Sequence, residues 1–256
     1  MCSYCSPEDC TSFSKRFVST SLIRILLITG YFGRIPLLKK IPESLAAKAK
    51  ERSGVPNALP YEKMIEAVNN QKRGYVFFAN ETPVKCRCRS AGFHRKRDTD
   101  VVCVDYGHIV EIVPLVKKGG IRLLHKEEVL DIIEEAKEKH MVHTVVTYKH
   151  HDMYSVCSCC GCCCIAIVPY RQRVYGTCET NGMVAVTDEE LCNGCGACVD
   201  HCKGFFNVRK LESNNGQMVA NANDHCAGCG TCRDICPTGA ISLECLEEKA
   251  VGWLEA

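Results

Sequence analysis

Eight cysteines in the last third of the chain recur with a constant offset. The two sets, 34 residues apart, are Cys192, Cys195, Cys198 and Cys202, and Cys226, Cys229, Cys232 and Cys236. Their surroundings repeat as well, CNGCGACVDHC against CAGCGTCRDIC, and each copy reads C-x2-C-x2-C-x3-C. Duplication at a fixed period indicates two copies of one supersecondary unit. Any fold of this chain must therefore bring several thiols together in a short loop, and must do so twice.

Cysteine is also the outlier of the composition, with 22 of 256 residues. Secreted scaffolds use many cysteines as disulfides, whereas proteins of reducing compartments use them as metal ligands. The first residues, MCSYCSPEDCTSFSKRF, do not resemble a secretory signal, because they hold no basic segment followed by an apolar core. We therefore expect a cytoplasmic protein with metal-bound thiolates.

The remaining composition disfavours several classes of function. The formal net charge of +2 provides no general attraction to nucleic acid. The longest apolar run, Leu22 to Phe32, contains Arg24 and is well short of the ~20 residues that span a bilayer. No glycine-rich nucleotide-binding loop is evident, which disfavours a flavin or nicotinamide site. We expect neither a transmembrane segment nor a nucleic-acid partner.

The C-terminal pattern resembles the bacterial-type ferredoxins that carry two [4Fe-4S] clusters, over roughly residues 184 to 246. In such proteins three cysteines of each run bind one cluster and the fourth binds the other. The resemblance implies that one cluster is held by Cys192, Cys195, Cys198 and Cys236. It implies that the other is held by Cys226, Cys229, Cys232 and Cys202. We expect the fourth cysteine of each run to start a helix, and short strands at MVAVTDEE and GAISLECL to cover the clusters.

Glycines and one lysine bear on this motif. Gly194, Gly196, Gly228 and Gly230 allow the backbone to turn and to bring amide N–H groups toward the sulfides. Zinc ribbons also use C-x2-C pairs, but with a longer insert between two pairs and no third and fourth cysteine at this spacing. Lys203 stands where the family pattern has proline. It either favours the reduced cluster or points to solvent, and the second interpretation is preferred.

The chain divides into three predicted regions. Residues 1–60 form an N-terminal helical segment with a cysteine-rich start, 61–183 a cysteine-rich iron–sulfur domain, and 184–256 a two-cluster ferredoxin-like domain with a tail. Helices are predicted at YEKMIEAVNNQK and HKEEVLDIIEEAKEKH. In the second, the apolar residues at helical spacing are Val129, Ile132, Ile133 and Ala136. We predict an α+β fold, with a duplicated β-hairpin/helix unit appended to a helix-containing cysteine-rich domain.

The stretch CSCCGCCC at 157–164 holds six further thiols. Disulfides within such a run are sterically poor, a passive core has no need of thiols, and a single zinc needs only four ligands. We therefore group the run with CRCRSAGFHRKRDTDVVC into one site. Its nine members are Cys86, Cys88, Cys103, Cys157, Cys159, Cys160, Cys162, Cys163 and Cys164. Either two cubanes sit here, or one larger or non-cubane cluster uses more than one thiolate per iron.

The order of motifs in the middle region carries a second resemblance. C-x-C-R is followed by a cysteine before an acidic, glycine-containing segment, by a helix ending MVH, and by C-x-C-C-x-C-C-C before the ferredoxin pair. This order is similar to that of a group of cysteine-rich [4Fe-4S] proteins of anaerobic microbes, over most of residues 61 to 240. The resemblance implies an additional iron–sulfur site and anaerobic metabolism.

Other cysteines and histidines are interpreted more simply. Cys178 and Cys245 are expected to be small buried residues. His140 and His143 would share one face of a helix, at its exposed end. The N-terminal trio, whose metal binding stays open, is Cys2, Cys5 and Cys10.

Together these features predict an iron–sulfur protein that moves single electrons. Two C-terminal [4Fe-4S] clusters would exchange electrons with a redox partner protein or a larger oxidoreductase complex, and the nine-thiol site would hold one or two further clusters. An electron carrier or an oxidoreductase subunit is favoured over a stand-alone enzyme. Two alternatives stay open for the middle region: a redox enzyme that reduces a disulfide or cofactor there, and a zinc-based interaction module.

Overall fold

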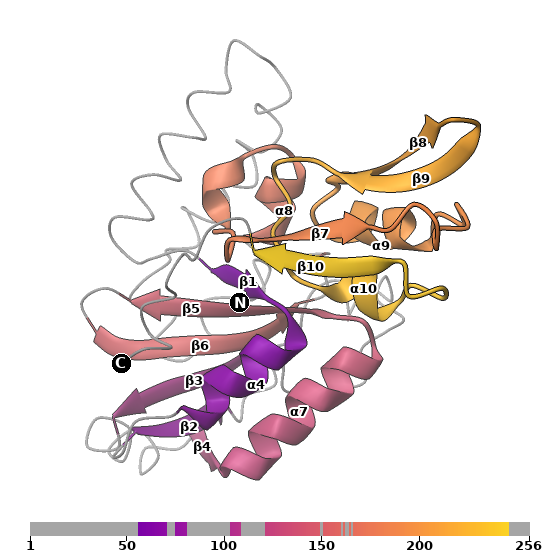
Figure 1. Ribbon diagram of the computed structural model, residues 1–256. Coiled ribbons are helices and arrows are strands. Elements are labelled where there is room, and N and C mark those ends of the chain that lie inside the picture. The colour runs from indigo at the N-terminus through magenta and orange to yellow at the C-terminus, as the bar shows by residue number, and fades with distance from the viewer. Residues whose placement is uncertain are drawn as a thin grey trace, which may run out of the picture.

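The structure is a computed structural model (Figure 1) that describes residues 56–70, 75–80, 103–108, 121–148, 151–159, 161, 164 and 166–245. Several sequence predictions fall outside these residues. They concern Cys2, Cys5, Cys10, Cys86, Cys88, Cys160, Cys162 and Cys163. Of Cys103 only the backbone is described.

An antiparallel sheet of six described strands forms the first layer. The strands are β1 (Asn57–Leu59), β2 (Tyr75–Asn80), β3 (Cys103–His108), β4 (Ile121–Leu124), β5 (Val142–Tyr148) and β6 (His151–Cys159). Their order in space is β1-β5-β6-β3-β2-β4. In this register Val142 lies opposite Cys159, and Cys103 lies opposite Cys157. The sheet therefore brings two of the predicted middle-site cysteines, Cys103 and Cys157, onto neighbouring strands.

Two helices pack on one face of this sheet, in front of it in Figure 1: α4 (Tyr61–Asn69) and α7 (Lys126–Glu138). Both confirm helices predicted from the sequence. Helix α7 begins with a capping box, in which His125 and Glu128 satisfy each other's backbone N–H groups. Val129 and Ile133 of α7 pack with Met64 of α4 and with strand residues in one apolar core.

The C-terminal elements lie along the β1 edge of the sheet (Figure 1). They are α8 (Ile167–Arg171), a short 3-10 helix (Tyr175–Thr177), β7 (Met183–Thr187), α9 (Ala197–Phe205), β8 (Arg209–Asn214), β9 (Gln217–Ala222), α10 (Thr231–Asp234) and β10 (Ile241–Cys245). Strands β7 and β10 pair antiparallel, and they are the two strands expected at MVAVTDEE and GAISLECL. Strands β8 and β9 form a hairpin from the insert between the two cysteine runs. The described helices and antiparallel strands agree with the predicted α+β class.

One detail of the cysteine runs differs from the prediction. The fourth cysteines do not start helices: Cys202 lies inside α9, and Cys236 follows the end of α10. The helices begin earlier because Gly196 and Gly230 are in the left-handed conformation, with φ of 76° and 78°. This conformation reverses the loop directly before each helix, so that the third cysteine of each run falls in its first turn.

The sheet and the C-terminal elements share a second apolar core. It joins Ala58 and Val142 of the sheet to Phe206, Val208 and other residues of the C-terminal part. The hydroxyl of Tyr170 donates a hydrogen bond of 2.8 Å to the carbonyl of His225, next to the second cysteine run. The C-terminal part is therefore built against the sheet.

Among the described helices, none is both long and apolar enough to cross a membrane.

Candidate metal centres

Two cavities in the C-terminal part are each lined by four cysteines. The first, called here the outer cavity, is lined by Cys192, Cys195, Cys198 and Cys236. Cys195 is exposed, Cys192 and Cys236 are half-buried, and Cys198 is buried. The outer cavity thus lies close to the protein surface. Its four cysteines are the set that the ferredoxin resemblance assigns to one cluster.

The second, called here the inner cavity, is lined by Cys202, Cys226, Cys229 and Cys232. These are the four cysteines that the resemblance assigns to the other cluster. Val142 of strand β5 and Phe206 also line this cavity. Three of its cysteines, Cys202, Cys226 and Cys229, pack against the core shared with the sheet. The inner cavity therefore lies between the C-terminal elements and the middle region.

The loop that carries Cys226 and Cys229 is packed so closely that it leaves no room for a side chain at Gly228. Gly228, between Cys226 and Cys229, has φ of 67°, and a Cβ there would lie 2.2 Å from the Asn181 side-chain oxygen and 2.6 Å from the Met183 carbonyl oxygen. The buried Asn181 amide donates to the carbonyls of Ala58 and Gly228, at 2.9 and 3.0 Å. Asn181 therefore ties the second cysteine loop to strand β1.

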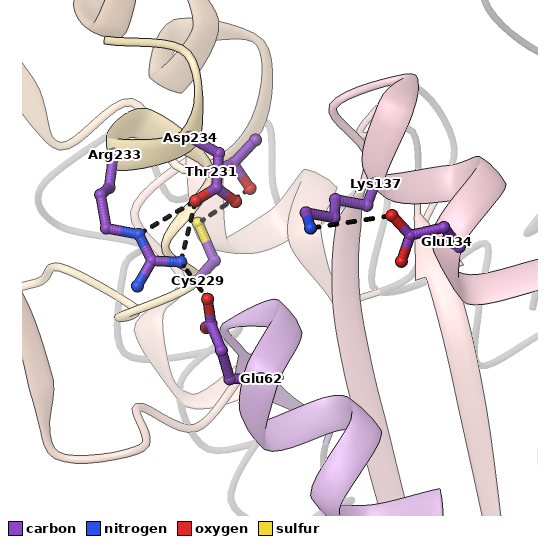
Figure 2. A network of polar contacts seen from close by, with 7 residues as sticks. All are labelled: Glu62, Glu134, Lys137, Cys229, Thr231, Arg233 and Asp234. Atoms are coloured by element: carbon purple, nitrogen blue, oxygen red, sulfur yellow. Dashed lines mark hydrogen bonds and ion pairs between the residues drawn. The ribbon is translucent and has the colours of Figure 1, made fainter. Parts of the chain in front are cut away.

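Helix α10 is also linked to helix α4, as Figure 2 shows. The guanidinium of Arg233 contacts the carboxylate of Glu62 in α4 at 2.7 Å and that of Asp234 at 2.8 Å. Beside this pair, the hydroxyl of Thr231 donates to the sulfur of Cys229 at 3.8 Å.

Several polar groups point at cysteine sulfurs. The backbone N–H of Val208 donates to the sulfur of Cys202 at 3.5 Å, and the sulfur of Cys236 lies 3.7 Å from the hydroxyl of Thr238. Hydrogen bonds to sulfur stabilise the negative charge of a thiolate and are one of the means by which a protein sets the potential of an iron–sulfur cluster. The donors are thus placed as a cluster site requires.

Burial raises the pKa of four of these thiols, those of Cys198, Cys202, Cys229 and Cys232, and so favours their protonated form when no metal compensates their charge. It raises the pKa of Cys229 well above its usual range and that of Cys232 to about 12. At Cys236 burial also acts to raise the pKa, but hydrogen bonds from Thr238 and from the N–H groups of Gly239 and Ala240 outweigh it, so the pKa is lowered. A metal that binds here must displace these protons and supply positive charge.

A buried arginine, which the sequence analysis did not single out, lies at the inner cavity. Arg209, the first residue of β8, is 3% exposed and lines this cavity. Its Nη1 donates to the sulfur of Cys232 at 3.8 Å. Burial raises the pKa of Cys198, Cys202 and Cys232, and the charge of Arg209 opposes burial at all three. Removing a charge from water costs several kcal/mol, so hydrogen bonds or a nearby negative charge must offset the burial of this cation.

The donor set of each cavity fits a [4Fe-4S] cluster. Four thiols converge on a partly apolar cavity, hydrogen-bond donors point at the sulfurs, and a buried cation balances the negative charge that four thiolates would bring. Within the described ranges, no three His, Cys, Asp or Glu side chains are grouped as they would be around a single metal ion.

The described middle-region thiols belong to the core that the sheet and the C-terminal elements share. Cys157, Cys159 and Cys164 are buried in the core against which the inner-cavity cysteines pack. The thiol of Cys159 donates to the sulfur of Cys164, and the two sulfurs are 3.6 Å apart. This hydrogen bond is the main cause that lowers the pKa of Cys164 to about 7 and raises that of Cys159. Cys178, expected to be buried, belongs to the same core.

Three simpler predictions were tested as well. Cys245 is exposed at the end of β10, so its expected burial is wrong. His140 and His143 do not share a helix face, because α7 ends at Glu138 and His143 is a buried residue of β5. Lys203 is exposed, which agrees with the interpretation that it points to solvent.

Comparison with known families agrees with the C-terminal geometry. Residues 177–240 match the family described as 4Fe-4S dicluster domain. The C-terminal region is therefore similar to ferredoxin-like domains that carry two [4Fe-4S] clusters and serve in iron–sulfur electron transfer. No curated protein matches the chain.

Proposed function

We propose that this dicluster protein transfers single electrons between a partner protein and the cysteine-rich middle region. The outer quartet, Cys192, Cys195, Cys198 and Cys236, would hold the cluster that faces the partner. The inner quartet, Cys226, Cys229, Cys232 and Cys202, would hold the cluster that faces the middle region. When bound, each cluster accepts and releases one electron. The observation that carries the proposal is the pair of four-cysteine cavities, one near the surface and one against the core.

The residues around the outer cavity support contact with a redox partner there. Cys195 is exposed, and the sulfur of Cys192 lies 4.0 Å from the carbonyl oxygen of Met218. Met218 and Leu191 are two of the large apolar side chains that are exposed, by 44% and 53%. A partner that covers them would exclude water beside the cavity. The partner would be a redox protein or a subunit of a larger oxidoreductase complex. The cysteine usage supports a cytoplasmic location as part of this proposal.

The middle region would be the other end of the electron-transfer path that starts at the partner protein. We propose that its nine thiols, grouped in the sequence analysis, bind a further iron–sulfur site. Two thiolates on one tetrahedral ion with metal–sulfur bonds of about 2.3 Å lie about 3.8 Å apart. The 3.6 Å between Cys159 and Cys164 is close to this value. The distance therefore suits two thiolates on one metal ion, as in the non-cubane alternative or in a zinc site, better than one thiolate per iron of a cubane.

The same pair supports a second candidate function, a redox enzyme. If Cys159 and Cys164 bind no metal, they form a buried dithiol next to the inner cavity. Conversion of such a dithiol to a disulfide releases two electrons and two protons. The two C-terminal clusters could accept those electrons one each. The reverse reaction would reduce a disulfide at this site.

Metal analysis of the oxygen-free purified full chain separates these functions. About eight irons with matching sulfide would mean the two C-terminal clusters alone, whereas about twelve to sixteen would support a further site. Zinc in place of the surplus iron would favour an interaction module in the middle region. An electron paramagnetic resonance (EPR) signal that changes when a disulfide substrate is added would favour the enzyme. A native protein without iron would refute the proposed function altogether.

A further inference from the structure

Arg209 connects the surroundings of both four-cysteine cavities. Its guanidinium donates to the carbonyls of Ala185 and Ala220 and to the hydroxyl of Thr187. Thr187 and Ala220 line the outer cavity, while Arg209 itself lines the inner one. The two alanines belong to one buried cluster with Cys198 and Cys232, a proposed ligand from each quartet. Arg209 therefore lies in the wall between the two cavities.

The hydrogen bonds of Arg209 leave its charge unbalanced. Its oxygen partners are two carbonyls and one hydroxyl, all of which are neutral. None of the ion pairs among the described residues includes Arg209, and its Nε has no hydrogen-bond partner there. A guanidinium does not lose its proton in a protein, so burial cannot neutralise it. Hydrogen bonds to these neutral oxygens do not by themselves require a charged side chain.

We propose that Arg209 is the shared counter-charge of the two clusters and raises the reduction potential of both. This inference rests on the proposed function, because it requires that both quartets hold clusters. A [4Fe-4S] cluster with four thiolate ligands becomes more negative by one charge when it is reduced. A nearby fixed cation stabilises the reduced form more than the oxidised form, and burial protects this interaction from screening by salt. Arg209 would thus act on the cluster potentials through its charge and would not be a ligand.

The test compares three Arg209 variants of the full chain with one matched control, all purified without oxygen. Arg209→Gln keeps a polar side chain without the charge, Arg209→Met keeps only the length, and Arg209→Lys keeps the charge. Lys210→Gln removes the same formal charge from the next residue, which is exposed. The midpoint potentials of both clusters are measured by redox titration followed by EPR, together with the iron content.

We expect both potentials to shift to more negative values in Arg209→Gln and Arg209→Met. Arg209→Lys should shift them less, and Lys210→Gln should leave them unchanged because water and salt screen its charge. Unchanged potentials in a fully loaded Arg209→Gln would overturn the inference. So would a negative shift in Lys210→Gln as large as that in Arg209→Gln.

Loss of iron from a variant is also decisive. If the two neutral variants lose iron while Arg209→Lys retains it, the charge itself is needed to hold the clusters, which supports the inference. If Arg209→Lys loses iron as well, the guanidinium acts through its hydrogen bonds and the inference is wrong. Failure of the proposed function is distinguishable, because the unmodified chain would then contain no iron.

Discussion

Gly228 offers a sharp test of how tightly the second cysteine loop is built. Gly228→Ala forces an alanine into the left-handed region, at a cost of about 1–2 kcal/mol. Its Cβ would also lie 2.2 Å from the side-chain oxygen of Asn181 and 2.6 Å from the Met183 carbonyl. Asn181 is buried and cannot move without losing its hydrogen bonds to Ala58, Gly228 and Met183.

The expected loss follows from these contacts. Gly228→Ala should lower the free energy of unfolding by roughly 3–6 kcal/mol. This sum adds the loss of three hydrogen bonds, at about 0.5–1.5 kcal/mol each, to the backbone cost. Gly239 is the matched control, because its φ is also 67° but no atom lies within 4 Å of its added Cβ. Gly239→Ala should therefore cost only the backbone part, about 1–2 kcal/mol.

Thermal unfolding of the oxygen-free holoprotein measures the difference. For a protein of this size each kcal/mol lowers Tm by roughly 2–4 °C, so we expect a drop of roughly 2–8 °C for Gly239→Ala and roughly 6–24 °C for Gly228→Ala. Loss of the visible absorbance of the clusters should accompany the lower Tm. Equal Tm values for the two variants would refute the packing argument for Asn181.

Three further predictions concern single side chains. Cys229→Ala should lose about four irons per chain, one cluster, whereas Cys245→Ala, an exposed residue outside both quartets, should lose none in the same iron assay. Burial lowers the pKa of His143 to about 4 from 6.5, so the unfolded chain binds the proton first and stability falls as pH drops below about 6.5. The free energy of unfolding should fall from this cause by about 2 kcal/mol by pH 5, and His143→Gln should remove that component; parallel pH profiles would contradict this. Glu62→Gln breaks an exposed ion pair with Arg233 and should lower the free energy of unfolding, measured with denaturant, by less than about 1 kcal/mol. A loss of several kcal/mol would contradict the expectation that this ion pair contributes little.

Part of the fold could be predicted because its signals are local. Helix α7 follows from the spacing of Val129, Ile133 and Ala136, all of which are buried. The fixed spacing within each cysteine run carries the ferredoxin resemblance, and the resemblance implies which thiols group together, including the exchange of Cys202 and Cys236 between the two runs. In the structure the two cavities are lined by those groups.

Other features depend on contacts between distant segments and carry no such signal. The strand order, in which β1 pairs with β5, follows from packing across more than eighty residues of chain. Helical spacing placed His140 and His143 on one face, yet the chain turns at His140, with φ of 52°, and enters a strand. Arg209 looked like any charged residue of the insert, because only the folded hairpin shows that its side chain is buried between two cavities.

The core shared by the sheet and the C-terminal elements has a consequence for dissection of this protein. Val142 comes from strand β5, yet it forms part of the inner cavity wall, and Ala58 anchors the loop beside it through Asn181. In a fragment that starts at residue 177, the inner cavity would be open to water on the side that β5 now covers. A fragment that stops before 177 would leave apolar side chains, Val142 among them, without cover. Neither half is an interchangeable module, and transplanting the redox unit into another scaffold would require rebuilding that missing wall.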